Sequence, residues 1–309
     1  MELKKPHRMR GIKKISGCQR RREWVAGYLF ILPNFIGFLT FMALPILATI
    51  AISFTEWDLI SPPKWVGFAN YQNLFRERVF WISLKNTIWF TILNVPIQSF
   101  LALFFAVLLN KKLKALTLFR TLFLFPWVCM AVAIGLTWMW LFNTQFGVIN
   151  YFLRKIGFSG VNWLTSTNTA LYSVLIVNIW QYLGWHIVLL LAALQTVPEE
   201  LYEAARVDGA NGWQIFWKVT FPLISPIFFY DLVVNMILTF QIFDLPFTMT
   251  GGGPGHATRL FNLYLYQKGF LYLQMGHACT MGVILFIIII IATYLMFRFM
   301  GRKINYLTS

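Results

Sequence analysis

Residues 199–226 read EELYEAARVDGANGWQIFWKVTFPLISP and form a polar segment between two long apolar runs. The segment combines acids, glycines and bulky aromatic residues within one short connection. The flanking runs determine the fold class, because their length and composition decide whether the chain crosses a membrane. The segment itself carries the most diagnostic pattern in the chain.

The composition is that of a membrane protein. Hydrophobic residues make up 58% of the 309 residues and charged residues only 12%, whereas a soluble domain carries roughly 45–50% apolar residues. The 31 Phe and 13 Trp residues add to this excess. These proportions predict a polytopic membrane protein.

Six apolar runs are long enough to span a bilayer, which takes about 20 residues of helix. Lipid offers no hydrogen-bond partners, so each run is expected to form a helix that satisfies its own backbone; the alternating pattern of a membrane barrel is absent. Prolines inside the runs are expected to kink these helices without ending them. The sequence therefore predicts an all-α integral membrane fold with six transmembrane helices. Their expected ranges are 25–54, 87–109, 121–142, 170–194, 222–248 and 277–300.

The net charge of +15 is divided unevenly between the two sides of the membrane. With six spans both termini lie on one side, and that side carries eighteen Lys and Arg residues against eight on the other. The positive-inside rule therefore places both termini and the 199–226 segment in the cytoplasm. The basic N-terminal tail is interpreted as a topology determinant that contacts anionic headgroups. Nucleic-acid binding is disfavoured, because no folded basic surface accompanies the tail.

The first apolar run is expected to stay attached to the chain, because it is much longer than the roughly 7–15 residues of a signal-peptide core. The cysteines, Cys18, Cys129 and Cys279, imply neither a disulfide framework nor a metal cluster. The four histidines are dispersed, so neither a metal site nor catalytic residues are expected. His186, within the fourth run, is interpreted as an interhelical hydrogen-bond donor.

Local signals predict a helix-turn-helix in the polar segment. Thr196, Pro198 and Glu199 have the start-of-helix pattern of a hydroxyl cap, a proline in the first turn and an acid three residues after the cap. The helix is expected to end near Val207, where Gly209 supplies a residue that can turn left-handed.

A second short helix should follow, because aromatic residues at positions 213, 216 and 217 recur at helical spacing. Pro222 is expected to end it. The alternative for such a segment is an amphipathic connector that lies on the membrane with its aromatic residues among the headgroups.

Several residues of the segment resemble, in fixed register, the cytoplasmic coupling loop of ABC-importer permease subunits. The matching positions are Glu203, Ala204, Ala205, Asp208, Gly209 and Pro222, although Phe221 stands where the family usually has Leu. In that family the loop docks into a cleft of the nucleotide-binding subunit. The resemblance implies that Glu203 is the acidic contact and that Gly209 sets the elbow. It also implies that the small Ala204 and Ala205 allow close approach.

A second resemblance lies just outside the fifth run. Thr250-Gly251-Gly252-Gly253-Pro254 is similar to a segment in permeases of the carbohydrate-uptake branch, including the larger maltose-type subunit. Taken alone the segment would be a turn. It is not a phosphate loop, because no Lys-Ser or Lys-Thr follows at Walker spacing and His256 occupies the last glycine position of the dinucleotide pattern. Nucleotide binding by this chain is therefore not expected.

The resemblance covers nearly the whole chain from the first span onward and implies a type I ABC-importer permease core. The additional spans and large external insertion of the maltose-type subunit are missing. The expected domains are a basic cytoplasmic tail (1–24), a transmembrane permease domain (25–301) with its coupling loop (196–222), and a cytoplasmic C-terminal tail (302–309).

Two polar stripes lie within the fourth and fifth runs. Asn178, Gln181 and Trp185 fall on one helical face, with Trp180 and Tyr182 alongside; Asp231, Asn235 and Thr239 repeat at i+4. Such residues are either interhelical hydrogen-bonding groups or the amides and aromatic rings of a sugar site. The maltose-type relative implies substrate contacts at Asn178, Trp180, Gln181, Trp185, Asn235 and Thr239, of which only Asn178 and Trp180 match by residue type. Asp231 and Asp244 are the only acids within these runs, and either is interpreted as a paired structural carboxylate; a proton-relay role would require partners that the sequence does not show.

These features predict a permease subunit of an ATP-driven ABC importer that carries a sugar, expected to be an oligosaccharide, across the bacterial plasma (inner) membrane. The implied partners are an extracellular solute-binding protein, two copies of a cytoplasmic ATPase that hold ATP and Mg, and a second related permease, with a homodimer left open. No cofactor and no enzymatic activity are expected on this chain. The alternative is a secondary transporter or channel without an ATPase partner, which should show relay acids or inverted repeats.

Overall fold

The computed structural model describes residues 17–110 and 116–301. Most of the predicted N-terminal tail, the basic residues at 111–115 and the predicted C-terminal tail (302–309) lie outside the described residues. The chain divides into two compact units, Met1–Ala51 and Ile52–Ser309. Each unit is described by itself.

The first unit is a long apolar helix. It comprises α1 (Gly17–Phe38), a π-helical turn (Leu39–Ala43) and α2 (Leu44–Ser53), whose last residues belong to the second unit. The stretch Glu23–Ser53 is long and apolar enough to cross a membrane, which confirms the predicted first span. Its apolar side chains are exposed on all sides, as expected for a helix whose surroundings are lipid.

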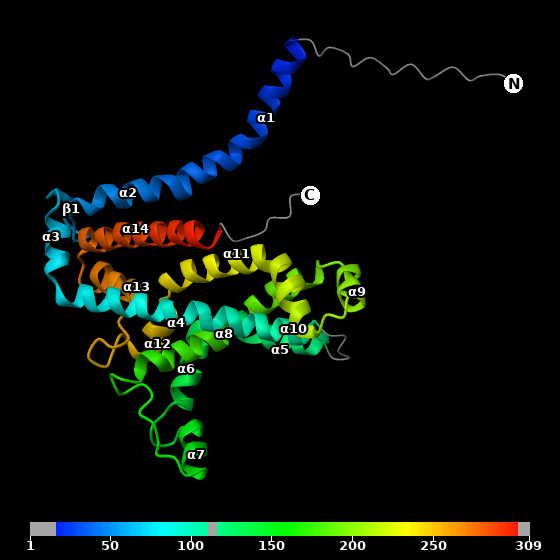
Figure 1. Ribbon diagram of the computed structural model, residues 1–309. Helices are drawn as coiled ribbons and strands as arrows, with labels where there is room; N and C mark the ends of the chain where they lie inside the picture. Colours follow the sequence, from blue (N-terminus) through cyan, green and yellow to red (C-terminus); the bar gives the residue numbers. More distant parts are fainter. Residues whose placement is uncertain (1–16, 111–115, 302–309) are drawn as a thin grey trace. The chain divides into compact units, whose positions relative to one another are not determined.

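The second unit is mostly helical (Figure 1). Its described residues include one small antiparallel strand pair, in which Thr55 lies opposite Trp65. Its elements are β1 (Thr55–Glu56), β2 (Lys64–Trp65), α3 (Ala69–Arg76), α4 (Arg78–Leu109), α5 (Leu116–Val128), α6 (Ala131–Leu141), α7 (Val148–Lys155), α8 (Ala170–Gln195), α9 (Glu199–Val207), α10 (Gly212–Ile215), a π-helical turn (Phe216–Thr220), α11 (Phe221–Phe240), α12 (Asp244–Thr250), α13 (Phe261–Tyr266), a π-helical turn (Gln267–Leu271) and α14 (Met275–Phe299).

The core of this unit lies where α4, α8 and α11 pack together. Ala102 and Ala106 of α4, Ile187 and Leu190 of α8, and Ile224 of α11 are all at most 1% exposed. Small alanines allow close helix approach, which is the main source of packing between helices in lipid. Three helices distant in sequence thus form one buried contact zone.

The packing of α5 on α8 depends on a glycine. A Cβ atom at Gly184 would lie 1.9 Å from the backbone oxygen of Phe123. Because no side chain fits at that distance, the absence of a side chain at position 184 permits this helix contact. The contact positions the aromatic residues at the end of α5 beside α8.

The predicted all-α membrane fold is confirmed, with two changes to the spans. Among the described residues, five helices are long and apolar enough to cross a membrane, and a sixth span results if α5 and α6, bent by 96°, count as one. The expected continuous helix over 121–142 is therefore wrong. The chain leaves helical geometry at Met130 (ψ 127°), and Gln181 donates to the backbone oxygen of Cys129 at 3.5 Å.

The second change concerns the fifth run. The expected span over 222–248 is wrong at its C-terminal end, because α11 ends at Phe240 and α12 begins only at Asp244. The side-chain amide of Asn262 donates to the backbone oxygen of Gln241 at 2.8 Å. A tertiary contact therefore satisfies a backbone group at the break, and local sequence gives no sign of it.

The predicted helix-turn-helix is present, with corrected boundaries. Helix α9 ends at Val207 as expected, and Gly209 has a φ of +77°. The predicted cap at Thr196 is wrong: its hydroxyl donates back to the oxygen of Ala193 at the end of α8. Asn211 instead caps α10 through a reciprocal pair of hydrogen bonds with Gln214.

Pro222 does not end the second helix, contrary to the prediction. A proline lacks an N–H and its ring clashes with the carbonyl four residues earlier. Here a π-helical turn precedes the proline, and the N–H of Phe221 donates to the oxygen of Phe216, five residues back. The wider turn accommodates the ring. The same arrangement occurs before Pro45, where Leu44 donates to the oxygen of Leu39.

Candidate functional site

Eight buried polar residues connect α4, α8 and α11, and each is at most 4% exposed. This polar network consists of Asn94, Gln98, Ser99, Asn178, His186, Asp231, Asn235 and Thr239. Polar side chains in a membrane interior are costly unless they bond to one another. The network therefore holds the three helices in a defined arrangement.

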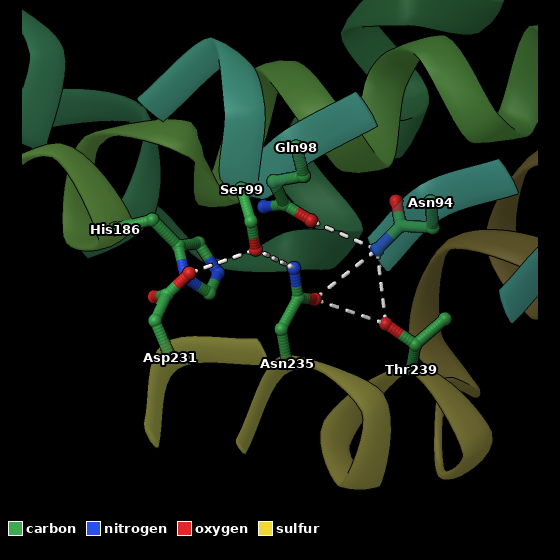
Figure 2. A network of polar contacts seen from close by, with 7 residues as sticks. All are labelled: Asn94, Gln98, Ser99, His186, Asp231, Asn235 and Thr239. Carbon is green, nitrogen blue, oxygen red and sulfur yellow. Dashed lines mark hydrogen bonds and ion pairs between the residues drawn. The ribbon is translucent and has the colours of Figure 1, made fainter. Parts of the chain in front are cut away.

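One end of the polar network is a buried acid. Asp231 accepts a hydrogen bond from the hydroxyl of Ser99 at 2.7 Å, and its other oxygen lies 2.6 Å from Nδ1 of His186 (Figure 2). The Ser99 oxygen accepts from the amide of Asn235 at 3.3 Å. His186 thus contacts another helix, as predicted, and Asp231 is a paired carboxylate.

The other end of the polar network is formed by amides. The Nδ2 group of Asn94 lies 2.8 Å from Oε1 of Gln98, 2.9 Å from the hydroxyl of Thr239 and 3.3 Å from Oδ1 of Asn235 (Figure 2). Asn178 donates to Oδ1 of Asn94 at 2.9 Å. Asn94 is therefore the point at which all three helices meet.

A cavity of about 570 Å³ lies beside the polar network. Polar and aromatic side chains form much of its wall. The indole rings of Trp127 and Trp185 stack with centroids 5.0 Å apart. The lining residues are Gln98, Trp127, Asn178, Tyr182, Trp185, His186, Val234, Asn235, Leu238, Thr239, Gln241, Ile242, Phe243, Asp244 and Leu245.

The structure brings four of the six expected substrate residues to this cavity: Asn178, Trp185, Asn235 and Thr239. Trp180 is not among the lining residues; its ring meets that of Trp138 edge-on at 5.4 Å. Gln181 does not line the cavity either and is directed toward the break between α5 and α6.

Sequence reasoning missed the contribution of α4. Asn94, Gln98 and Ser99 interrupt an otherwise apolar run on both sides of Pro96, and this interruption was the available signal. Trp127 was missed as well, because it was one aromatic residue among many. Asp244 reaches the cavity at the start of α12, where a helix N-terminus favours a negative charge.

The coupling segment (residues 196–222) lies at the opposite end of α8 and α11 from the connection between α12 and α13 (Figure 1). No residue of α9 is buried. Glu203, Asp208 and Gly209 are exposed, and within the described part of the chain neither carboxylate has a hydrogen bond or ion pair. Val207 is 87% and Trp213 72% exposed. The segment therefore presents free acids beside uncovered apolar side chains.

The glycine segment at the other end is anchored rather than loose. The hydroxyl of Thr258 bonds to Thr250 and to the oxygen of Gly253. The amide of Asn86, on α4, donates to the oxygen of His256 at 2.9 Å. Glycines in this segment adopt positive φ angles, including Gly252 at +95°. Residues with a side chain rarely adopt this backbone conformation.

An ion pair fixes the start of α4 nearby. Lys268 lies 2.8 Å from Glu77, which also accepts a hydrogen bond from Tyr264. Burial raises the pKa of Tyr264 well above its ordinary value, and the bond to Glu77 raises this pKa further. The phenol therefore stays protonated and keeps donating to the carboxylate.

The chain is similar in sequence to known transport proteins over most of its length. A family model described as a binding-protein-dependent transport system inner membrane component matches residues 86–306. The chain is 36% identical to a probable ABC transporter permease protein, YesP, of Bacillus subtilis, over 93% of this chain and 94% of that protein. It is also 36% identical to the trehalose/maltose transport system permease protein MalF of Thermococcus litoralis, over 80% and 84%.

A solved structure shares the fold. One chain in the crystal structure of a bacterial alginate ABC transporter, in complex with an alginate pentasaccharide-bound periplasmic protein, superposes with a TM-score of 0.81. The match covers 94% of this chain and 99% of that chain at 22% sequence identity.

Proposed function

Because the chain belongs to the family of binding-protein-dependent transport system inner membrane components, we propose that it is the sugar-conducting permease subunit of an ATP-driven ABC importer. It is a transport subunit, and the ATPase is a separate chain. The observation that carries the sugar assignment is the cavity lined by amides and stacked indoles. Amides bond to sugar hydroxyls and aromatic rings pack on apolar sugar faces.

The substrate is an oligosaccharide or disaccharide delivered by an external binding protein. The trehalose/maltose relative supports this class of substrate. Asn178, Trp185, Asn235 and Thr239 contact it directly, since they line the cavity. Trp180, which meets Trp138, and Gln181, which bonds to the backbone of Cys129, are not assigned direct contacts with the sugar.

The coupling segment binds the ATPase. Glu203 and Asp208 are exposed and have no partner within the described residues, so they are available to cations of another chain. Ala204 and Ala205 permit close approach, and Gly209 sets the angle between α9 and α10. The π-helical turn before Pro222 continues directly into α11. Movement of the segment is thereby transmitted to the cavity wall.

The termini lie in the cytoplasm together with the coupling segment. The excess of Lys and Arg on that side supports this orientation. The chain is then organised as a cytoplasmic tail (1–24), a permease domain (25–301) and a C-terminal tail (302–309).

The complete importer contains this chain, a second permease, two ATPase subunits that bind ATP and Mg, and the binding protein. The cavity on this chain forms one wall of a shared pathway. ATP binding drives the pathway outward-facing only if the ATPase contacts of the coupling segment differ between the two states.

Reconstitution tests this function. The affinity-tagged chain is purified in mild detergent with the proteins that accompany it, and the complex is placed in vesicles with the binding protein. Uptake of radiolabelled maltose, trehalose and maltotetraose is then measured with ATP and Mg on the ATPase side. Uptake that requires ATP and persists with a protonophore supports the proposal. Uptake without ATP that is lost with the protonophore, or recovery of a single active chain, contradicts it.

A further inference from the structure

In the polar network, which group donates and which accepts each hydrogen bond is fixed, and Asp231 fixes it. Ser99 donates its hydroxyl proton to one carboxylate oxygen, so the Ser99 oxygen accepts from the amide of Asn235. This assignment holds wherever the proton lies along the bond between Asp231 and His186, because that bond uses the other carboxylate oxygen. Asn235 must therefore turn its Oδ1 atom away from Ser99, toward Asn94 and Thr239.

The same donor and acceptor assignment extends through Asn94 to Gln98 at the edge of the cavity. Oδ1 of Asn235 accepts a hydrogen bond from the hydroxyl of Thr239 at 3.2 Å, and the Thr239 oxygen in turn accepts from Nδ2 of Asn94 at 2.9 Å; the same Nδ2 group lies 3.3 Å from Oδ1 of Asn235. The same Nδ2 group donates to Oε1 of Gln98, while Oδ1 of Asn94 accepts from Asn178. A reversed Gln98 amide would place two NH₂ groups against each other. The remaining atom, Nε2 of Gln98, is therefore a hydrogen-bond donor whose orientation is fixed.

This donor has no partner among the described residues, although it is buried and its side chain is only 1% exposed. Buried donors in native proteins are almost always paired, so an unpaired one requires an explanation. Gln98 lines the cavity. The nitrogen is covered in this conformation, so a ligand can bond to it only when the cavity widens.

We propose that Gln98 is a specificity-determining residue whose Nε2 atom donates a hydrogen bond to an acceptor oxygen of the transported sugar. The acceptor is a hydroxyl or ether oxygen of an uncharged saccharide, because no Lys or Arg is among the described residues that line the cavity. Asp231 is a positioning residue, which holds the donor in place through Ser99, Asn235 and Asn94. The proposal rests on the sugar-permease function proposed above.

The test compares wild-type importer with Gln98→Met, which keeps the length of the side chain and removes both amide groups. The complete reconstituted complex transports whichever of maltose, trehalose and maltotetraose the wild type accumulates, together with single-deoxy analogues of that sugar. KM and the maximal rate are measured for each. Gln267→Met is the matched control, because Gln267 is also buried with one unpaired amide atom but lies outside the cavity.

The wild-type and Gln267→Met complexes should prefer the parent sugar over one deoxy analogue by about tenfold in KM, the size expected for one hydrogen bond. Gln98→Met should lose this preference and keep its maximal rate. A Gln98→Met complex that keeps every preference overturns the assignment. If the wild-type complex transports none of the three sugars, the proposed function itself fails.

The Asp231→Asn variant tests whether Asp231 orients the Gln98 donor or only stabilises the helix packing. An asparagine can donate to Ser99, so the polar network can reverse and the donor at Gln98 is no longer fixed. The preference between parent and deoxy sugar should fall, and Asp231→Glu should restore part of it. If Asp231→Asn lowers only the amount of assembled complex and leaves the preference unchanged, the positioning role of Asp231 is overturned.

Discussion

The coupling segment and the polar network show opposite relations between sequence and function. The segment is exposed, continuous in sequence and bounded by local signals such as the left-handed Gly209. The polar network is buried and joins residues from three helices, with Asn94 and Thr239 separated by 145 positions. The proposed docking surface is thus encoded locally, whereas the proposed sugar site depends on which helices pack together.

Of the substitutions that test this contrast, the largest effect is expected from one in the coupling segment. Glu203→Lys reverses an unpaired charge at the proposed ATPase contact, and ATP-driven uptake should fall by about 100-fold or more. The assembled chain should remain in the membrane, because the residue is exposed. Uptake in reconstituted vesicles measures the effect. Glu200→Lys, another exposed acid of α9, serves as control, and normal uptake by Glu203→Lys would refute the role of Glu203.

The next effect concerns the packing that creates the cavity. Gly184→Ala places a methyl group against the backbone of Phe123 and should cost about 3 kcal/mol, which lowers the melting temperature of the purified chain by roughly 6–12 °C. Gly37→Ala, at a position with open space around it, should leave the melting temperature unchanged. Equal melting temperatures for the two variants would show that α5 does not depend on this contact.

Within the polar network, Ser99→Ala removes the donor to one oxygen of Asp231 and should destabilise the chain by about 2 kcal/mol. Ser225→Ala removes only a local bond to the backbone of Pro222 and should have a much smaller effect. Thermal unfolding of both variants in detergent measures the difference. If Ser99→Ala and Ser225→Ala lose stability equally, hydrogen bonds between helices contribute no more to the stability of the chain than hydrogen bonds within one helix.

The smallest effect is expected from the cap within the coupling segment. Asn211→Ala removes the reciprocal bonds with Gln214 and should weaken α10 by about 1 kcal/mol. Amide hydrogen exchange over residues 212–216 should become faster, while the core of α8 is unaffected. Asn211→Ser retains a capping oxygen and should restore the protection; unchanged exchange in Asn211→Ala would mean that α11 alone holds this turn.

The errors of the sequence-based prediction share one cause. Pro222 was expected to end a helix, but a π-helical turn carries the helix past it. The third and fifth runs were expected to be continuous, but each contains a break at which a distant amide, Gln181 or Asn262, bonds to the backbone. In each case the local rule was sound and the tertiary surroundings changed its outcome.

The candidate site was predicted in part. Residues on α8 and α11 were found because their polar stripes repeat at helical spacing. Gln98 was missed although it follows Asn94 at i+4 in α4, because its importance arises from the direction of the hydrogen bonds that begin at Asp231. No pattern within α4 contains that information.

The sequence by itself determined that the chain lies in a membrane, approximately where it crosses, and that α9 ends at a left-handed glycine. These properties follow from solvent transfer and local backbone preference, which act residue by residue. Only the tertiary structure decided that α4 faces α8 and α11, that the α5–α6 pair is bent, and that the buried donor of Gln98 at the cavity has no partner among the described residues. These properties depend on contacts between distant segments, because lipid satisfies no polar group and buried polar side chains must bond within the protein.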